Sequence, residues 1–194
     1  MDTRNWFLAV LGSIFQISSK EFQEIVWVKG EGPFCCSWEE CLSIFDDLNS
    51  SALIDSPKLW QEVRLSEIER QRVVQFRDIL EAYNDYSDTP YFHNIARNKD
   101  IIEDPKWIKV REHAQELRKT LWPLYKNLCE ELANDKDEAI RESILFRLWV
   151  PSRIVEKLTK DPSSKVAERA RSTLENQKLL EEWHKDTDFM NGKD

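Results

Sequence analysis

The sequence predicts an all-α fold, an irregular helical bundle, on three observations. First, only four of the 194 residues are glycine. Hairpins and nucleotide-binding loops need glycine for their positive φ angles, so its scarcity favours helices joined by short loops. Second, helix start signals recur along the chain. Third, apolar residues in the long segments recur every three or four positions, which is the period of a helix with one buried face.

Composition sets the size and class of the protein. Hydrophobic residues make up 41% and charged residues 33% of a length that suits one globular domain. Within a single domain 1–194, we expect an acidic helical core region over 1–131, a repeat region over 132–175 and a frayed tail over 184–194. No apolar run approaches the roughly 20 residues that a membrane-spanning helix requires, so we expect no membrane partner.

The first 17 residues, "MDTRNWFLAVLGSIFQI", allow two interpretations. The stretch is long and apolar enough for the core of a signal peptide, but it contains Asp2 and lacks both a strongly basic start and a small-x-small cleavage site. We therefore interpret it as the first helix of the fold and keep the signal peptide as the alternative.

Seven local patterns predict where helices begin. Four have the spacing of a capping box, in which Ser or Asp is followed three residues later by Glu. They are Ser18 with Glu21, Ser37 with Glu40, Ser66 with Glu69, and Asp135 with Glu138. Three others place a cap residue before a proline in the first helical position: Ser56-Pro57, Asp104-Pro105 and Asp161-Pro162. The only non-helical stretch that we expect is "VWVKGEGPF", residues 26–34, a loop preceded by a short extended segment.

Two amphipathic helices should supply most of the core. The first, 66–82, has an apolar face made of Ile68, Val73, Phe76, Ile79, Leu80 and Tyr83. The second begins at Asp104, and its apolar seam is Trp107, Val110, Ala114, Leu117, Leu121, Leu124, Leu128 and Leu132. Pro123 interrupts this seam and should kink or break the helix near Leu121. One more short helix fits between them, within 95–103.

The C-terminal part contains an internal repeat with an offset of 26 residues. "LANDKDEAIRESIL", from Leu132, matches "LTKDPSSKVAERAR", from Leu158, and between them Pro151 opens a helix that ends at Leu158. The pattern resembles helical repeats of the HEAT and leucine-rich-variant type over residues 132–175. Arg141 of the first copy is replaced by Ala167 in the second. Because two copies are too few for a free-standing solenoid, we expect both units to dock on the preceding helices.

The sequence contains no pattern typical of catalysis or metal binding. The histidines His93, His113 and His184 occur in no HxxxH, HExxH or ExxH motif, and the cysteines Cys35, Cys36, Cys41 and Cys129 form no CxxC pair. There is no GxSxG elbow and no phosphate-binding glycine loop. We therefore expect no catalytic residue, no metal and no cofactor. Reduced, buried thiols fit a cytoplasmic protein.

The whole acidic excess lies in the first half of the chain. Residues 1–95 hold 8 Lys/Arg and 16 Asp/Glu, a net of −8, whereas residues 96–194 hold 20 of each. This distribution opposes nucleic-acid binding by the first half, since phosphate contacts require concentrated Lys and Arg. It favours a basic partner, or it serves solubility alone.

The stretch "YNDYSDTPYFHN", residues 83–94, is the candidate surface for a protein partner. Tyrosines anchor interfaces, and aspartates beside them can pair with Lys or Arg of the partner. We expect Tyr83 and Phe92 to belong to the core. The predicted contact residues are Asp85, Tyr86, Asp88, Tyr91 and His93, with Asp46 and Asp47 as steering charges.

In general character, this small, acidic, helical protein with a Tyr/Asp patch is similar to bacterial immunity proteins of the colicin and contact-dependent-inhibition kinds. The resemblance implies an inhibitor that binds a basic, nuclease-type toxin domain and whose acidic residues mimic phosphate charge. Two alternatives stay open: a helical-repeat scaffold or adaptor that binds through 132–175, and a metal-dependent helical enzyme. The oligomeric state also stays open.

Overall fold

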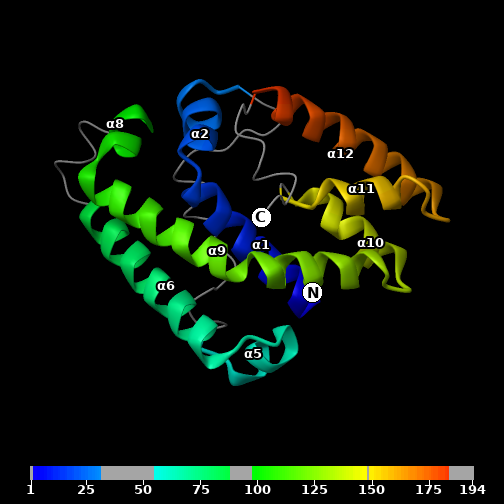
Figure 1. The fold of residues 1–194 in the computed structure, drawn as a ribbon, viewed down its shortest axis with the longest axis horizontal. Helices are drawn as coiled ribbons and strands as arrows, with labels where there is room; N and C mark the ends of the chain where they lie inside the picture. Colours follow the sequence, from blue (N-terminus) through cyan, green and yellow to red (C-terminus); the bar gives the residue numbers. More distant parts are fainter. Residues whose placement is uncertain (1, 32–54, 88–97, 148, 184–194) are drawn as a thin grey trace. The chain divides into compact units, whose positions relative to one another are not determined.

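The computed structural model describes residues 2–31, 55–87, 98–147 and 149–183, and every regular element in these ranges is a helix (Figure 1). The predicted all-α fold is therefore confirmed. In chain order the elements are α1 (Thr3–Ser18), α2 (Lys20–Phe22), the π-helical η1 (Gln23–Val28), α5 (Pro57–Val63), α6 (Glu67–Ser87), α8 (Asn98–Glu103), α9 (Pro105–Ala133), α10 (Glu138–Ser143), the 3₁₀ turn η2 (Ile144–Phe146), α11 (Ser152–Leu158) and α12 (Ser164–Trp183). Within these ranges, no helix is both long and apolar enough to span a membrane.

The chain forms two compact units, which are described separately. One consists of residues 1–12 with 122–194, and the other of residues 13–121. Both boundaries lie inside helices, after Gly12 in α1 and next to Pro123 in α9. Each of these two helices therefore contributes one part to each unit.

Helix α1 forms as predicted and is a core helix. Asp2 starts it by accepting the backbone N–H groups of Arg4 and Asn5 at 2.9 and 3.2 Å. Arg4 is the only charged residue in its 16 residues. Its buried apolar side chains are Trp6, Phe7, Leu8, Val10, Leu11, Ile14, Phe15 and Ile17. They occur on all sides of the helix, which is typical of a helix in the interior of a protein.

Three of the predicted helix starts are confirmed. At α6, the Ser66 N–H donates to Glu69 Oε2 at 2.8 Å and the Glu69 N–H donates to Ser66 Oγ at 3.3 Å, which is a reciprocal capping box. Ser56 precedes the first residue of α5, a proline. Asp104 accepts a backbone N–H from the first turn of α9 at 2.7 Å. The Ser37 pair lies outside the described residues.

Two predicted caps are displaced by one or two residues. Ser19, not Ser18, caps α2, because its Oγ accepts the N–H of Phe22 at 3.1 Å. Asp137, not Asp135, caps α10 and accepts a backbone N–H at 2.9 Å. The cap is the residue whose backbone is extended just before the helix, and spacing alone does not show which of two neighbouring polar residues that is.

The loop expected at 26–34 starts later than predicted. Residues Gln23–Val28 are π-helical, so the expected extended segment is wrong. Its Val-rich sequence favours a strand locally, but Trp27 is buried and tertiary packing decides the outcome. Gly30 then has a φ of 66°, in the left-handed region that glycine adopts without strain. Residues 32–34 lie outside the described part of the chain.

The buried face of α6 largely follows the prediction. Val73, Phe76, Leu80 and Tyr83 are all buried, but Ile68 is 66% exposed. At about 100° per residue, Ile68 lies about 140° around the helix from Val73, which removes it from the core face. The predicted short helix between the two long ones is confirmed as α8.

Helix α9 continues through Pro123 without a break, and one position of its buried seam differs from the prediction just beyond the proline. Up to Leu121 the buried apolar residues are those predicted. Beyond the proline, Tyr125 is fully buried while Leu124 is partly exposed, so the prediction for Leu124 is wrong. Regular i, i+3, i+4 spacing permits either residue to continue the seam, and the packing around the larger aromatic side chain selects Tyr125.

A buried amide joins three elements of the unit formed by residues 13–121. Gln23 is fully buried, and its Oε1 accepts from Trp107 Nε1 at 3.1 Å and from Arg111 Nη1 at 3.3 Å. Its Nε2 donates to the carbonyl of Ile17 at 2.7 Å. Burial lowers the pKa of the Arg111 guanidinium. Because buried polar groups must be hydrogen-bonded, this amide fixes how α1, η1 and α9 meet.

The two turns of the sequence repeat use their aspartates in the same way. Asp135 Oδ1 accepts the N–H of Asp137 at 3.1 Å, and Asp161 Oδ1 accepts the N–H of Ser163 at 2.9 Å. Helix α11 starts directly after its proline, as predicted, but α12 starts at Ser164, so Pro162 lies in the turn and not in the first helical position. Helices α11 and α12 pack against each other, and α10 contacts α12 (Figure 1). Membership of the HEAT type stays a prediction.

Candidate functional site: the acidic outer face of α6

Two of the predicted partner-binding residues lie in the last turns of α6, which extends five residues beyond its predicted end. Asp85 is exposed, as expected, and Tyr86 is helical. Asp88, Tyr91, His93, Asp46 and Asp47 lie outside the described residues. The candidate site is therefore described from α6 and the described residues that contact it.

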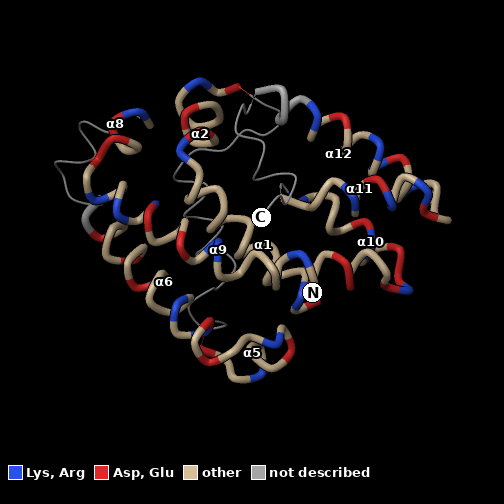
Figure 2. Tube along the Cα trace, viewed as in Figure 1, with Lys and Arg blue, Asp and Glu red and all other residues tan. Residues whose placement is uncertain are grey.

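Asp85 belongs to a row of carboxylates along one side of α6. Asp78, Glu81 and Asp85 are spaced by three and four residues, so their side chains share one side of the helix. The side chains of Asp78 and Glu81 are 59% and 55% exposed. Figure 2 shows acidic and basic positions along the same helix. We call these three residues, with Asp55, the acidic outer face of α6.

Arg77 forms ion pairs with three of the carboxylates of this face. Its guanidinium lies 3.1 Å from Asp55, 2.9 Å from Asp78 and 3.9 Å from Glu81, and its own side chain is only 14% exposed. Burial acts to lower the pKa of Arg77, but the hydrogen bonds to Asp78 and Asp55 outweigh it and the pKa is raised. Arg77 thus stays charged and holds three exposed carboxylates together. With Asp85 included, the face has four negative charges and one positive charge.

An aromatic cluster fixes the end of α6 beneath this face. Tyr83 is buried, as predicted, and its ring centroid is 5.0 Å from that of Trp107. Trp27 packs on the same indole at 5.7 Å. Asn98, at the start of α8, donates to the carbonyl of Trp27 at 2.6 Å. Tyr83, the first residue of the candidate stretch, and Asn98, just beyond it, both contact one aromatic cluster.

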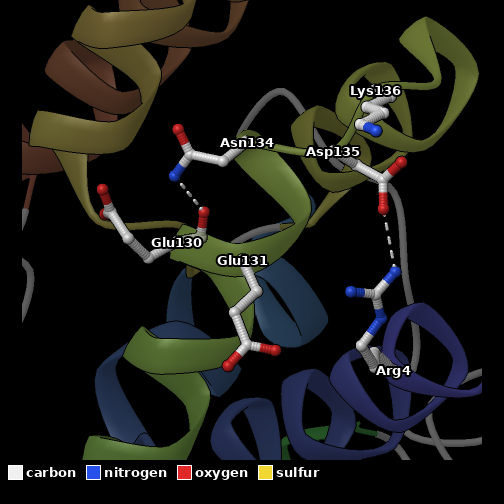
Figure 3. A pocket seen from close by; sticks show the side chains of 6 residues that line it. All are labelled: Arg4, Glu130, Glu131, Asn134, Asp135 and Lys136. Atoms are coloured by element: carbon white, nitrogen blue, oxygen red, sulfur yellow. Dashed lines mark hydrogen bonds and ion pairs between the residues drawn. The ribbon is translucent and has the colours of Figure 1, made fainter.

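A polar hollow of about 590 Å³ lies in the other unit (Figure 3). Its lining residues are Arg4, Glu130, Glu131, Asn134, Asp135 and Lys136. Figure 3 shows Arg4 directed at Asp135, and the two form an ion pair of 3.0 Å. Lys157 lies 3.3 Å from Glu130 and 2.7 Å from Asn134. Because Arg4 pairs with Asp135 and Lys157 with Glu130, these charges are already neutralised, and we place no functional site in the hollow.

Groups that could hold a metal are not assembled in the part of the chain that the structure describes. No three His, Cys, Asp or Glu side chains there are placed to hold a metal ion. The Cys129 thiol is buried and forms no disulfide, and burial raises its pKa, which keeps it protonated. His113 is exposed on α9.

Comparison with known proteins gives no information on the fold or on the acidic outer face of α6. No family model, curated protein or solved structure matches the chain. The assignment of the acidic outer face as a candidate site therefore depends only on the geometry of its residues.

Sequence reasoning missed most of the acidic outer face. The i, i+3, i+7 spacing of Asp78, Glu81 and Asp85 was visible in the sequence and could have identified the row. Asp55 and Arg77 could not have been linked, because 22 residues separate them along the chain and only the folded structure shows that they meet.

Proposed function

We propose that the protein is a protein-binding inhibitor of the immunity type, which neutralises a basic, nuclease-type bacterial toxin through the acidic outer face of α6. The observation that carries the proposal is the grouping of Asp55, Asp78 and Glu81 around Arg77, with Asp85 one turn further along. Such a face attracts a basic partner and steers its encounter. The net charge of −8, confined to residues 1–95, acts in the same direction.

The physical basis is charge mimicry. A nuclease binds phosphates through concentrated Lys and Arg. A rigid row of carboxylates offers the same charges on a surface that cannot be cleaved. Arg77 favours this role because it holds the carboxylates in place before binding, so that less side-chain entropy is lost on association.

The first experiment identifies the partner. The tagged protein is purified from its native cell and the co-purifying proteins are identified by mass spectrometry. A small basic domain whose nuclease activity falls on addition of this protein would support the proposal. Co-purification of acidic proteins only, or of a nuclease that stays fully active, would contradict it.

The second experiment tests the face. The triple variant D78N/E81Q/D85N should slow association with that partner by about tenfold at low salt, because exposed charges of this kind steer the encounter of the two proteins. The matched control, E156Q/E168Q/E175Q, removes the same number of exposed carboxylates from α11 and α12. Equal association rates for the two triple variants would show that the face is not the binding surface.

A single substitution tests whether Asp85 is central to the interface. Asp85→Ala should weaken binding by about 2 kcal/mol, as loss of a central contact does, and Tyr86→Ala by a similar amount. Calorimetric titration measures both. If both variants bind within about 0.5 kcal/mol of the unmodified protein, the assignment of these residues is wrong.

A scaffold or adaptor function is the second candidate, supported by the matching aspartate turns at Asp135 and Asp161. Its binding surface would lie on α10, α11 and α12. A partner whose affinity falls in E156Q/E168Q/E175Q but not in D78N/E81Q/D85N would favour this candidate.

A further inference from the structure

Phe146, in η2, presents an aromatic side chain to solvent in the unit formed by residues 1–12 and 122–194. The residue is 55% exposed, whereas the preceding Leu145 is buried. The Leu145 carbonyl accepts a hydrogen bond from Thr173 Oγ1 of α12 at 3.2 Å, which fixes the turn to that helix. A single exposed apolar residue is common and does not by itself indicate a partner. The groups around the ring therefore decide whether it has a function.

The guanidinium of Arg169, on α12, lies over the Phe146 ring. Its Cζ atom is 4.0 Å from the ring centroid, which is the arrangement of a cation–π contact. Both residues are exposed, so the stacked pair is open to a partner. The N–H groups of a guanidinium point outward in its own plane, and stacking through one flat face leaves them available to a carboxylate. Because the pair is formed before binding, less side-chain entropy is lost on association.

Arg169 forms no ion pair with a carboxylate of the residues that the structure describes. Lys165, one turn earlier on α12, pairs with Glu142 at 2.7 Å, and Glu138 attracts the same lysine. The only electrostatic contact between Arg169 and these groups is its repulsion of Lys165. The two carboxylates of α10 are thus directed to Lys165, and the charge of Arg169 is not offset by an ion pair.

Arg147, the residue after Phe146, adds a second positive charge. Its Nη2 donates to Asn5 Oδ1 at 3.1 Å, which is a neutral partner, and it too forms no ion pair in the described ranges. An arginine stays protonated at neutral pH. Two guanidinium charges without a carboxylate therefore accompany one exposed aromatic ring, in a chain whose net charge is −8. This local excess of positive charge favours an acidic partner.

We propose that Phe146 and Arg169 form a docking surface for an acidic segment of a partner protein. In the complex, a carboxylate of the segment pairs with Arg169 and a neighbouring apolar side chain packs on the exposed part of the Phe146 ring. Aromatic residues and arginines are enriched at the centres of protein interfaces. The acidic outer face of α6 belongs to the other unit, so the test of this surface does not depend on the inhibitor function.

A nucleic acid could also stack on an aromatic ring and place a phosphate on an arginine. Binding of a nucleic acid requires concentrated Lys and Arg along the backbone. Here the next cation on α12, Lys165, is already paired with Glu142, and residues 96–194 have a net charge of zero. The charges therefore favour an acidic protein segment over a nucleic acid.

Two synthetic peptides are the probes. One has leucine and phenylalanine between glutamates, and in the other every glutamate is replaced by glutamine. Each is titrated into the labelled full-length protein, and the backbone amides of Phe146 and Thr173 are followed by NMR. We expect the acidic peptide to bind with a dissociation constant on the order of a millimolar, as suits a short peptide, and the neutral one to bind about tenfold more weakly. Equal binding of the two peptides, or no shift change at millimolar acidic peptide, would overturn the proposal.

Arg169→Gln is the decisive variant, and Arg171→Gln is its control. Arg171 is also an exposed arginine of α12, but at about 100° per residue it lies on the opposite side of the helix. The first variant should weaken binding of the acidic peptide by about tenfold, and the second should leave it unchanged. Circular dichroism confirms that both are folded. Binding that is equally strong in Arg169→Gln and in the unmodified protein would refute the role of Arg169.

Phe146→Ala tests the aromatic part of the surface. It should weaken binding of the acidic peptide by about tenfold, while the melting temperature stays close to that of the unmodified protein, because the ring is already largely in water. Unchanged binding would show that the ring takes no part.

A single-stranded oligothymidine is the third probe. No binding, or binding weaker than that of the acidic peptide, supports a protein partner. Tighter binding of the oligothymidine, lost in Arg169→Gln, would identify a nucleic-acid site and overturn the proposal.

Discussion

The side chain of Arg141 connects the two turns of the repeat that contain Asp135 and Asp161. Its Nε and Nη2 donate to Asp161 at 2.7 and 2.9 Å, and its Nη1 donates to the carbonyl of Asp135 at 2.9 Å. The side chains of Arg141 and Asp161 are only 12% and 4% exposed. Such a bidentate pair, shielded from water, is stronger than an ordinary surface ion pair.

Asp161→Asn should lower the free energy of unfolding by about 2 kcal/mol, because Arg141 loses its charged partner in a shielded position. Urea denaturation measures the change. Asp135→Asn is the matched control. We expect a smaller loss there, because the ion pair of Asp135 with Arg4 is 22% and 27% exposed. A loss for Asp135→Asn as large as that for Asp161→Asn would contradict the importance of shielding.

The same pair should make stability depend on pH in the acidic range. The hydrogen bond from Arg141 lowers the pKa of Asp161 below its ordinary value of 3.8. The unfolded state therefore binds the proton more readily than the native state. The stabilisation should be complete above that ordinary value and should disappear as pH falls through the lowered pKa. Urea denaturation of the unmodified protein and Asp161→Asn between pH 7 and pH 2 should show curves that converge at the acidic end; a constant difference would refute this assignment.

For α6 and α9, the sequence predicted that each helix forms but did not predict every side chain that it buries. The heptad-like spacing of α9 predicted most of its buried apolar face, including Leu128 and Leu132, but the helix shows no break near Leu121. Beyond that point Tyr125 replaces Leu124 in the core. Helix α6 supplies both a buried face and three of the four carboxylates of the acidic outer face.

The burial of Tyr125 in place of Leu124 predicts different costs for substitutions at these two neighbouring residues. Tyr125→Ala should lower the free energy of unfolding by about 3 kcal/mol or more, because it leaves a cavity in a fully buried position. Leu124→Ala should cost about 1 kcal/mol, because that side chain is already partly in water. Thermal and urea unfolding compare the two variants. Equal costs would show that both residues belong to the core.

For the molecule as a whole, the uneven charge is the feature that bears most on function. Residues 1–95 have a net charge of −8, whereas residues 96–194 have a net charge of zero. A surface charge acts over a Debye length of about 10 Å at 0.1 M salt, so it influences an approaching partner more than it stabilises the fold.

Salt should therefore weaken the proposed complex. Raising the NaCl concentration from about 0.05 M to about 0.5 M should reduce the association rate by about tenfold or more, while the dissociation rate changes little. Surface plasmon resonance with the captured toxin domain measures both rates. The triple variant D78N/E81Q/D85N should show a shallower dependence on salt. A salt-independent association rate would contradict electrostatic steering.

The sequence by itself determined the all-α class, half of the helix starts that fall in the described residues and most of the buried faces of the long helices, because these depend on neighbours within one or two turns. Ser66 and Glu69 illustrate this, since both partners of the capping box lie in the same turn. The local sequence pattern also predicted that Tyr83 lies in the core and Asp85 at the surface.

Only the tertiary structure decided which distant groups meet. The contacts of Asp55 with Arg77 and of Gln23 with Arg111 link residues 22 and 88 positions apart. The choice of Tyr125 over Leu124 and of π-helix over strand at Gln23–Val28 likewise depends on packing. Local preferences there favour two outcomes nearly equally, and burial against remote side chains supplies the free energy that selects one.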